Sequence, residues 1–108
     1  HVTVERLLCE AATASSIDTD LYRAIEAALT KRYPSASVVP VLFPGGTDLR
    51  VARRRGGIGY GFGAVDSGAS LGQVYSQLHA HDEHIALADV RATVEVLHLV
   101  ATTYLTHV

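Results

Sequence analysis

The C-terminal part of the chain carries an apolar repeat at helical spacing, and this repeat is the strongest constraint on the fold. The repeat starts at about Leu87 and consists of Val90, Val94, Leu97, Ala101, Tyr104 and Leu105. Spacings of three and four residues bring such side chains onto one side of an α-helix. The sequence therefore predicts a long helix from about residue 87 toward the C-terminus.

A second helix is predicted between Asp18 and Tyr33. Asp18 is a suitable N-cap, because its carboxylate can accept hydrogen bonds from the free backbone N–H groups of the first turn. One face of this helix is marked by apolar side chains at helical spacing: Leu21, Ile25, Ala28 and Leu29. Pro34 disfavours helical geometry in the residue before it, so we expect the helix to end near Tyr33.

Three short segments have the patterns of β-strands. Residues 2–8 alternate apolar and polar side chains from Val2 to Leu8, which is typical of a half-buried strand. Residues 38–43 form a nearly continuous apolar run, as in a parallel strand covered on both faces, although Pro40 favours an edge or a bulge. Residues 58–62 carry glycine at every other position, which indicates close backbone packing.

The remaining segments complete an alternating order of elements. Thr47 or Asp48 can cap a short helix that continues through Arg55 and ends at the glycines in positions 56 and 57. Residues 63–78 are predicted to form a loop. The order strand, helix, strand, helix, strand, loop, helix favours an α/β fold with a mainly parallel sheet in a three-layer arrangement.

Composition narrows the class of protein. At 108 residues, with 48% hydrophobic and 19% charged residues, the chain is predicted to form a single globular domain at most. Its net charge of −2 argues against nonspecific nucleic-acid binding. No apolar run approaches the roughly 20 residues that span a bilayer, so no membrane association is expected. Cys9 has no second cysteine to pair with, which favours a reducing, cytoplasmic compartment.

Three histidines and two carboxylates cluster just before the long helix, at His79, His81, Asp82, Glu83 and His84. Imidazole and carboxylate are the usual ligands of zinc, and the neighbouring acids can fix a histidine tautomer. A helical segment would bring the second and third histidines onto one face, whereas an extended one would bring the first and second together. The alternative is that all five are polar loop residues that help to start the helix, and the residues alone favour this alternative.

The segment from Pro44 to Asp48 is the second candidate site. Glycines after a predicted strand let backbone N–H groups approach a ligand, and the positive end of a helix behind them suits a carboxylate or a developing oxyanion. The alternative is a tight turn with a helix cap. The segment is not a phosphate loop, because the lysine of such loops is missing. The arginines at 53–55 are interpreted as solvated residues at a helix end.

Several motifs occur together in one order. They are Tyr33-Pro34, Val39-Pro40, Gly45-Gly46-Thr47-Asp48-Leu49-Arg50, Arg54-Arg55-Gly56, Tyr60-Gly61-Phe62-Gly63 and Leu78-His79-Ala80-His81-Asp82-Glu83-His84-Ile85. From about Leu8 onward the chain thereby resembles the zinc metallopeptidase family that includes aminoacylase, glutamate carboxypeptidase, acetylornithine deacetylase and succinyl-diaminopimelate desuccinylase. Members hydrolyse amide bonds next to a carboxylate with two zinc ions, which cobalt or manganese can replace.

The resemblance assigns a place and roles to parts of this chain. Residues 1–15 look like the exit strand and connector of the family's lid domain, and residues 16–108 like the C-terminal part of its catalytic α/β domain. By the same resemblance, His79 is a metal ligand, and Gly46 and Thr47 hold the substrate carboxylate of a small peptide or N-acyl amino acid. Two further residues, Asp82 and Glu83, support the loop.

Two positions depart from the family pattern. Relatives carry glycine at the position of Ala80, which restricts the backbone if that position needs a positive φ. They carry arginine at the position of His84, which is therefore interpreted as peripheral rather than as a ligand.

The resemblance also predicts what this segment lacks. The family's His-x-Asp pair, its Glu-Glu pair with the general base and a further acidic ligand have no match here, so no catalytic residue is expected in the segment. Catalytic zinc needs about three protein ligands. We therefore expect an inactive C-terminal segment that requires the rest of the catalytic domain or associates with itself. The alternatives are a non-catalytic binding or self-assembling module, and a small metal domain built on His79, His81 and His84.

Overall fold

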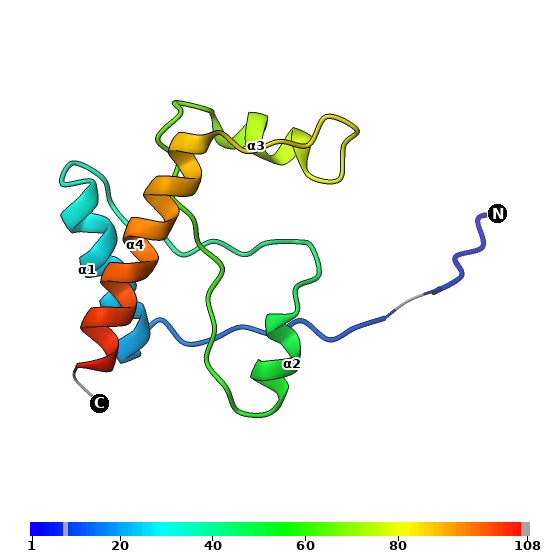
Figure 1. The fold of residues 1–108 in the computed structure, drawn as a ribbon. Coiled ribbons are helices and arrows are strands. Elements are labelled where there is room, and N and C mark those ends of the chain that lie inside the picture. The colour runs from blue at the N-terminus through cyan, green and yellow to red at the C-terminus, as the bar shows by residue number, and fades with distance from the viewer. Residues whose placement is uncertain (8, 107–108) are drawn as a thin grey trace. The chain divides into compact units, whose positions relative to one another are not determined.

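The computed structural model describes residues 1–7 and 9–106, and every element of secondary structure within these ranges is an α-helix. The helices are α1 (Asp20–Arg32), α2 (Leu49–Arg54), α3 (Leu71–Gln77) and α4 (Leu87–Leu105), as Figure 1 shows. The chain divides into two compact units. Unit 1 comprises His1–Ser16 and Leu42–Tyr60, and unit 2 comprises Ile17–Val41 and Gly61–Val108. Each unit is described by itself.

Helix α1 forms where the sequence predicts a helix, with its cap shifted by one residue. Thr19 is the N-cap, and its hydroxyl accepts a hydrogen bond from the backbone N–H of Tyr22 at 3.1 Å. Asp18, the predicted cap, instead forms an ion pair with Arg23 at 2.7 Å. The C-cap is Tyr33, next to the proline that ends the helix, as predicted.

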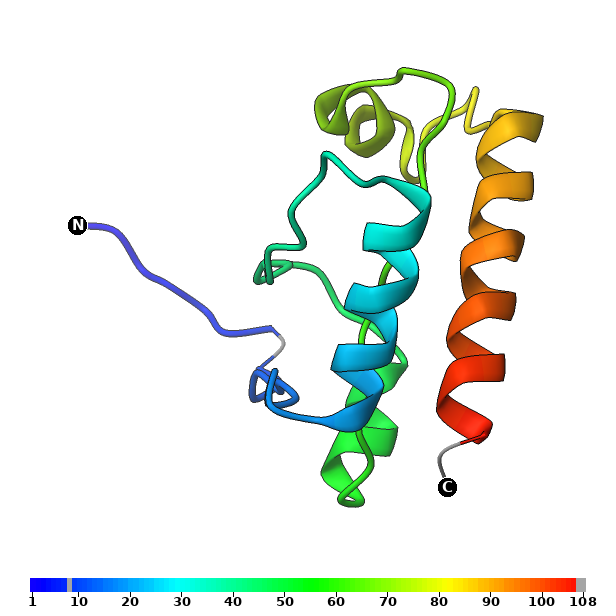
Figure 2. The ribbon, with the colours of Figure 1, turned by 90° about the vertical axis from the view of Figure 1, so that its left-hand side faces the viewer.

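Helices α1 and α4 run side by side and form the core of unit 2 (Figures 1 and 2). Helix α1 contributes Ala24, Ile25 and Ala28 to this core, and the middle of α4 contributes the fully buried Val96. Three of the buried side chains are alanines, Ala24 and Ala28 on α1 and Ala92 on α4, and their small size lets the two helices approach closely. The predicted C-terminal helix is thus confirmed, and its buried face supplies most of its packing energy.

Helix α3 lies inside the segment that the sequence predicts as a loop, so that prediction is wrong for residues 71–77. Ser70 and Gln73 form a reciprocal capping box: the hydroxyl accepts from the Gln73 N–H at 3.3 Å, and the Gln73 amide oxygen accepts from the Ser70 N–H at 2.7 Å. The Ser-x-x-Gln spacing is a recognised start signal for a helix. It outweighs the glycine at position 72, which lowers helix propensity.

Unit 1 is held by polar contacts around α2. The Arg53 guanidinium donates to the carbonyl oxygens of Thr13 and Gly59 and to the hydroxyl of Ser15, at distances between 2.6 and 3.3 Å. Arg53 is therefore a structural link between three backbone segments, and its interpretation as a solvated residue is wrong. The helix ends at Arg54 with Arg55 as its C-cap, and Gly56 follows with a φ of +82°, which agrees with an end predicted from the two glycines.

The predicted α/β fold with a parallel sheet is wrong for the described part of the chain, in which no residue forms a strand. Residues 38–43 and 58–62 are non-helical but make no backbone ladder. Of the first predicted strand, Val2 and Val4 are exposed, and Leu8 lies outside the described residues. Apolar periodicity shows which side chains share a face, but a strand also needs a second backbone to accept and donate its hydrogen bonds.

The glycine-rich segment 58–62 illustrates this difference. An added Cβ on Gly59 would lie 2.7 Å from the Leu49 side chain, so close packing does occur there, although against a side chain rather than another strand. Nothing lies within 4 Å of the same position on Gly61. The pattern thus reflects a local contact with α2. Among the described residues, no helix is long and apolar enough to cross a bilayer.

Candidate functional site

His79 occupies a strained turn directly after α3. Its φ is +62°, and it is the one non-glycine residue with a positive φ in the described part of the chain. The turn is closed by hydrogen bonds from the Ala80 N–H to the Gln77 carbonyl at 3.0 Å and from the Glu83 N–H to the Ala80 carbonyl at 3.3 Å. The left-handed conformation is adopted by His79. From the sequence, a positive φ is considered at the next residue, Ala80. Strained backbone of this kind clusters at functional sites.

The three histidines of this segment are all exposed, and they differ in their hydrogen bonds. His84 is held by two contacts, from Nδ1 to the Asp82 carbonyl oxygen at 2.6 Å and from Nε2 to the Gln77 amide nitrogen at 3.3 Å. His79 and His81 are exposed. These contacts use both ring nitrogens of His84.

The described residues do not form a metal site by themselves. Across residues 1–7 and 9–106, no group of three or more histidine, cysteine, aspartate or glutamate side chains is placed to hold a metal ion. Catalytic zinc requires about three protein ligands, and the imidazole of His79 is exposed.

A groove of about 900 Å³ opens in unit 2 beside this turn. Glu83, His84 and Gln77 supply polar groups to its lining. Its apolar lining comes from α3 and from the segments on either side of it, and includes Val65, Ala69, Leu71, Val74, Leu78 and Ile85. Its volume lies within the range of small-molecule sites, at the upper end.

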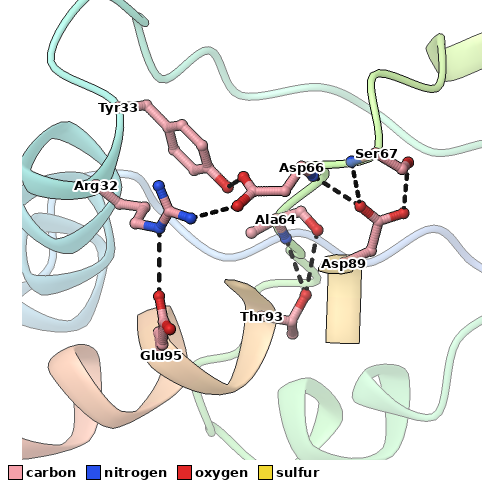
Figure 3. A network of polar contacts seen from close by, with 8 residues as sticks. All are labelled: Arg32, Tyr33, Ala64, Asp66, Ser67, Asp89, Thr93 and Glu95. Atoms are coloured by element: carbon pink, nitrogen blue, oxygen red, sulfur yellow. Dashed lines mark hydrogen bonds and ion pairs between the residues drawn. The ribbon is translucent and has the colours of Figure 1, made fainter. Parts of the chain in front are cut away.

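Asp89, in the first turn of α4, fixes the loop that borders this groove (Figure 3). One carboxylate oxygen accepts from the backbone N–H groups of Asp66 and Ser67, both at 2.7 Å, and the other accepts from the Ser67 hydroxyl at 2.8 Å. These bonds, first of all the one from the Ser67 hydroxyl, lower the pKa of Asp89 below its ordinary value. Asp89 is thus a buried, ionised anchor.

Thr93, one turn further along α4, ties the same loop at Ala64. Its hydroxyl accepts from the Ala64 N–H at 3.1 Å and lies 3.3 Å from the Ala64 carbonyl oxygen, to which it donates (Figure 3). Residues 64–67 are therefore bound to two successive turns of α4.

The end of α1 reaches the same loop through Asp66 (Figure 3). The Tyr33 hydroxyl donates to Asp66 at 2.6 Å, and Arg32 forms an ion pair with the same carboxylate. The hydrogen bond to Asp66 is the main reason why the pKa of Tyr33 is raised. Arg32 also lies 3.4 Å from a Glu95 carboxylate oxygen and stacks over the Tyr33 ring at 5.1 Å.

Sequence reasoning missed this network. Its one local signal is Asp89 itself, which shares the buried face of α4 with Ala92, Val96 and Val100. A carboxylate at helical spacing with buried apolar residues must have partners, because an unpaired buried charge is costly. The partners, Asp66 and Ser67, are more than twenty residues away, and no spacing rule identifies them.

Gly46 and Thr47, the predicted substrate-binding residues, belong to unit 1, whereas His79, Asp82 and Glu83 belong to unit 2. The Thr47 hydroxyl lies 3.4 Å from the backbone nitrogen of Leu49, and the Thr47 carbonyl accepts from the Arg50 N–H at 3.1 Å. Both predicted residues are exposed. The loop therefore has the geometry of a turn that opens α2, and its surface is accessible to a ligand.

The sequence matches the profile of one protein family. The profile of the peptidase family M20/M25/M40 matches residues 1–103, nearly the whole chain. No curated protein matches the chain, and no solved structure matches it either. Because the family match covers far more than half of the sequence, the chain belongs to peptidase family M20/M25/M40.

Proposed function

We propose that the chain is the C-terminal catalytic-domain segment of a zinc-dependent metallopeptidase or amidohydrolase. The reaction class would be cleavage of an amide bond next to a carboxylate, in a small peptide or an N-acyl amino acid. The family match over residues 1–103 supports this proposal, since the family is one of generally metal-dependent peptidases. In this proposal residues 1–15 lead out of a lid domain and residues 16–108 belong to the catalytic domain.

His79 is the proposed metal ligand, and its left-handed backbone is the observation that supports this role most directly. A positive φ costs a non-glycine residue on the order of 1 kcal/mol, and such strain persists where a particular side-chain direction is needed. Zinc, when bound, would polarise the substrate carbonyl and lower the pKa of a water molecule. Asp82 and Glu83 are proposed to support the turn, and Gly46 and Thr47 to bind the substrate carboxylate.

The segment by itself is proposed to be inactive. Its described residues offer no set of three metal ligands. The purified chain should therefore not hydrolyse N-acetylated amino acids when zinc, cobalt or manganese is supplied. Robust hydrolysis by the purified chain would refute this part of the proposal.

A zinc titration followed by the imidazole NMR signals tests the role of His79. We expect weak binding in which the His79 signals shift first, loss of this response in His79→Ala, and little change in His81→Ala. Equal losses in the two variants would instead support a small metal domain that uses several histidines.

A second candidate function, a non-catalytic binding or self-assembling module, is favoured by one observation. Val39, Val41 and Leu42 expose between 69% and 90% of their surface. Clusters of exposed apolar side chains of this kind mark sites of protein association. Light scattering tests this candidate, because a monodisperse monomer would count against exposed association surfaces. For either candidate we propose a cytoplasmic location, which is supported by the unpaired Cys9.

A further inference from the structure

Helix α4 carries a second apolar stripe, separate from the face that packs on α1. The stripe is formed by exposed apolar residues at spacings of three and four, namely Leu87, Val90, Val94, Leu97, Ala101 and Leu105. At roughly 100° per residue, its centre lies about 145° around the helix from the buried face formed by Ala92, Val96 and Val100. The stripe is therefore not part of the α1–α4 core.

The stripe is nearly symmetric about the middle of α4. Val94 and Leu97 flank the helix midpoint, Val90 and Ala101 lie outside them at nearly equal distances, and the two terminal leucines complete the series. A stripe with this symmetry matches itself when a second helix is laid across it in the opposite direction. Larger and smaller side chains then face each other, because each Val90 meets an alanine and each Val94 meets a leucine.

We propose that this chain forms a two-fold symmetric dimer through antiparallel pairing of the apolar stripe of α4 with that of a second copy. A two-fold interface uses the same surface on both partners, and a self-matching stripe satisfies this condition without any further surface. Leu97 of one copy packs against the partner's Val94 at the centre, and the same contact recurs by symmetry.

The area of the stripe determines how strongly the two copies are expected to associate. Its large side chains expose between 37% and 69% of their surface, which amounts to roughly 500 Å² per copy and about 1,000 Å² for the pair. This total lies at the lower end of specific interfaces, where association is weak and reversible. We therefore expect a dissociation constant in the micromolar range, well above that of an obligate dimer.

The polar edge of the stripe provides a test of the register of the dimer. Arg91 and His98 border the stripe on the same side of α4, and both are exposed. Two-fold symmetry brings equal edges together, so Arg91 of one copy lies near the partner's His98. The two residues are seven positions apart on one helix, which is too far for a contact within a single chain.

Sedimentation equilibrium of the full chain between about 1 and 200 µM tests the dimer. We expect the mass to rise with concentration from 11.5 kDa toward twice that value. Val94→Glu should raise the dissociation constant at least about tenfold, because it places a charge against the partner's Leu97. Ala88→Glu, on an exposed position of α4 away from the stripe, is the matched control and should leave the constant unchanged. Far-UV circular dichroism checks that both variants remain helical.

A gain of affinity tests the register independently of any loss. His98→Glu should lower the dissociation constant severalfold at low salt, because the new carboxylate lies beside the partner's Arg91, and Arg91→Glu in the same chain should abolish the gain. A chain that stays monomeric at 200 µM would overturn the proposal. An association that Val94→Glu leaves unchanged would also overturn it, since another surface would then be responsible.

Discussion

Asp89 on α4 and Ser67 in the preceding loop are joined by two hydrogen bonds to different oxygens of one carboxylate. The Ser67 N–H donates to Oδ1 at 2.7 Å, and the Ser67 hydroxyl donates to Oδ2 at 2.8 Å. Asp89 is the buried charged residue of the described core, with 8% of its surface exposed. The pair therefore determines how the groove-lining loop is attached to the long helix.

Replacing Asp89 by asparagine should weaken the attachment of this loop to α4. The amide can keep its oxygen toward the backbone N–H groups of Asp66 and Ser67 only if its nitrogen faces the Ser67 hydroxyl, which must then accept a hydrogen bond instead of donating one. Hydrogen bonds to a neutral amide oxygen contribute less than those to a carboxylate, so we expect the midpoint of thermal unfolding to fall by about 5 °C. Circular dichroism melts measure the change. Glu26→Gln, on an exposed position of α1, should leave the midpoint within about 1 °C.

The same carboxylate predicts a pH dependence of stability. Hydrogen bonding lowers the pKa of Asp89 in the folded chain below the ordinary value of 3.8. Its contribution is therefore complete above about pH 4 and is lost as the pH falls through the lowered pKa. Melts of the natural chain and of Asp89→Asn should differ by a constant amount from about pH 5 to 7 and converge in more acidic solution. A difference that persists unchanged to pH 2 would contradict the assignment.

Burial in the α1–α4 core predicts that truncating two different valines changes the free energy of unfolding by very different amounts. Val96 is fully buried between the helices, whereas Val51 on α2 leaves 51% of its surface exposed. Val96→Ala removes two buried methyl groups and leaves a small cavity, so we expect the free energy of unfolding to fall by about 2 kcal/mol. Val51→Ala should change it by no more than about 0.5 kcal/mol. Urea unfolding of both variants provides the comparison.

The helices of this chain were largely predictable because their signals are local. The apolar repeat after residue 87 predicts α4, the spacing between Leu21 and Leu29 predicts α1, and the glycines after Arg55 predict the end of α2. Helix α3 also has a local signal in the Ser70–Gln73 capping box, although its segment is predicted as a loop. Caps and periodicity depend on residues within a few positions of each other, so a single sequence contains them.

The predicted sheet failed because strand pairing is not a local property. The apolar run at 38–43 has the pattern of a strand covered on both faces. In the structure Val39, Val41 and Leu42 are exposed, and the backbone of this run forms no ladder with another described segment. The polar network around Asp89 was missed for a related reason, since its donors come from a distant loop. Local motifs did identify the family, which the match over residues 1–103 confirms.

The backbone of His79 yields a test that is independent of metal binding. Glycine adopts a φ of +62° without steric cost, whereas alanine does not, so His79→Gly should be more stable than His79→Ala by about 1 kcal/mol. Both variants lack the imidazole, which removes any contribution of the side chain from the comparison. The matched control is His81, which is exposed in the same turn region and has no positive φ. There His81→Gly should be no more stable than His81→Ala, because glycine adds only unfolded-state entropy. Equal stability of the two His79 variants in urea unfolding would show that the turn is not held in the left-handed conformation, and the strain argument for a ligand at this position would fall with it.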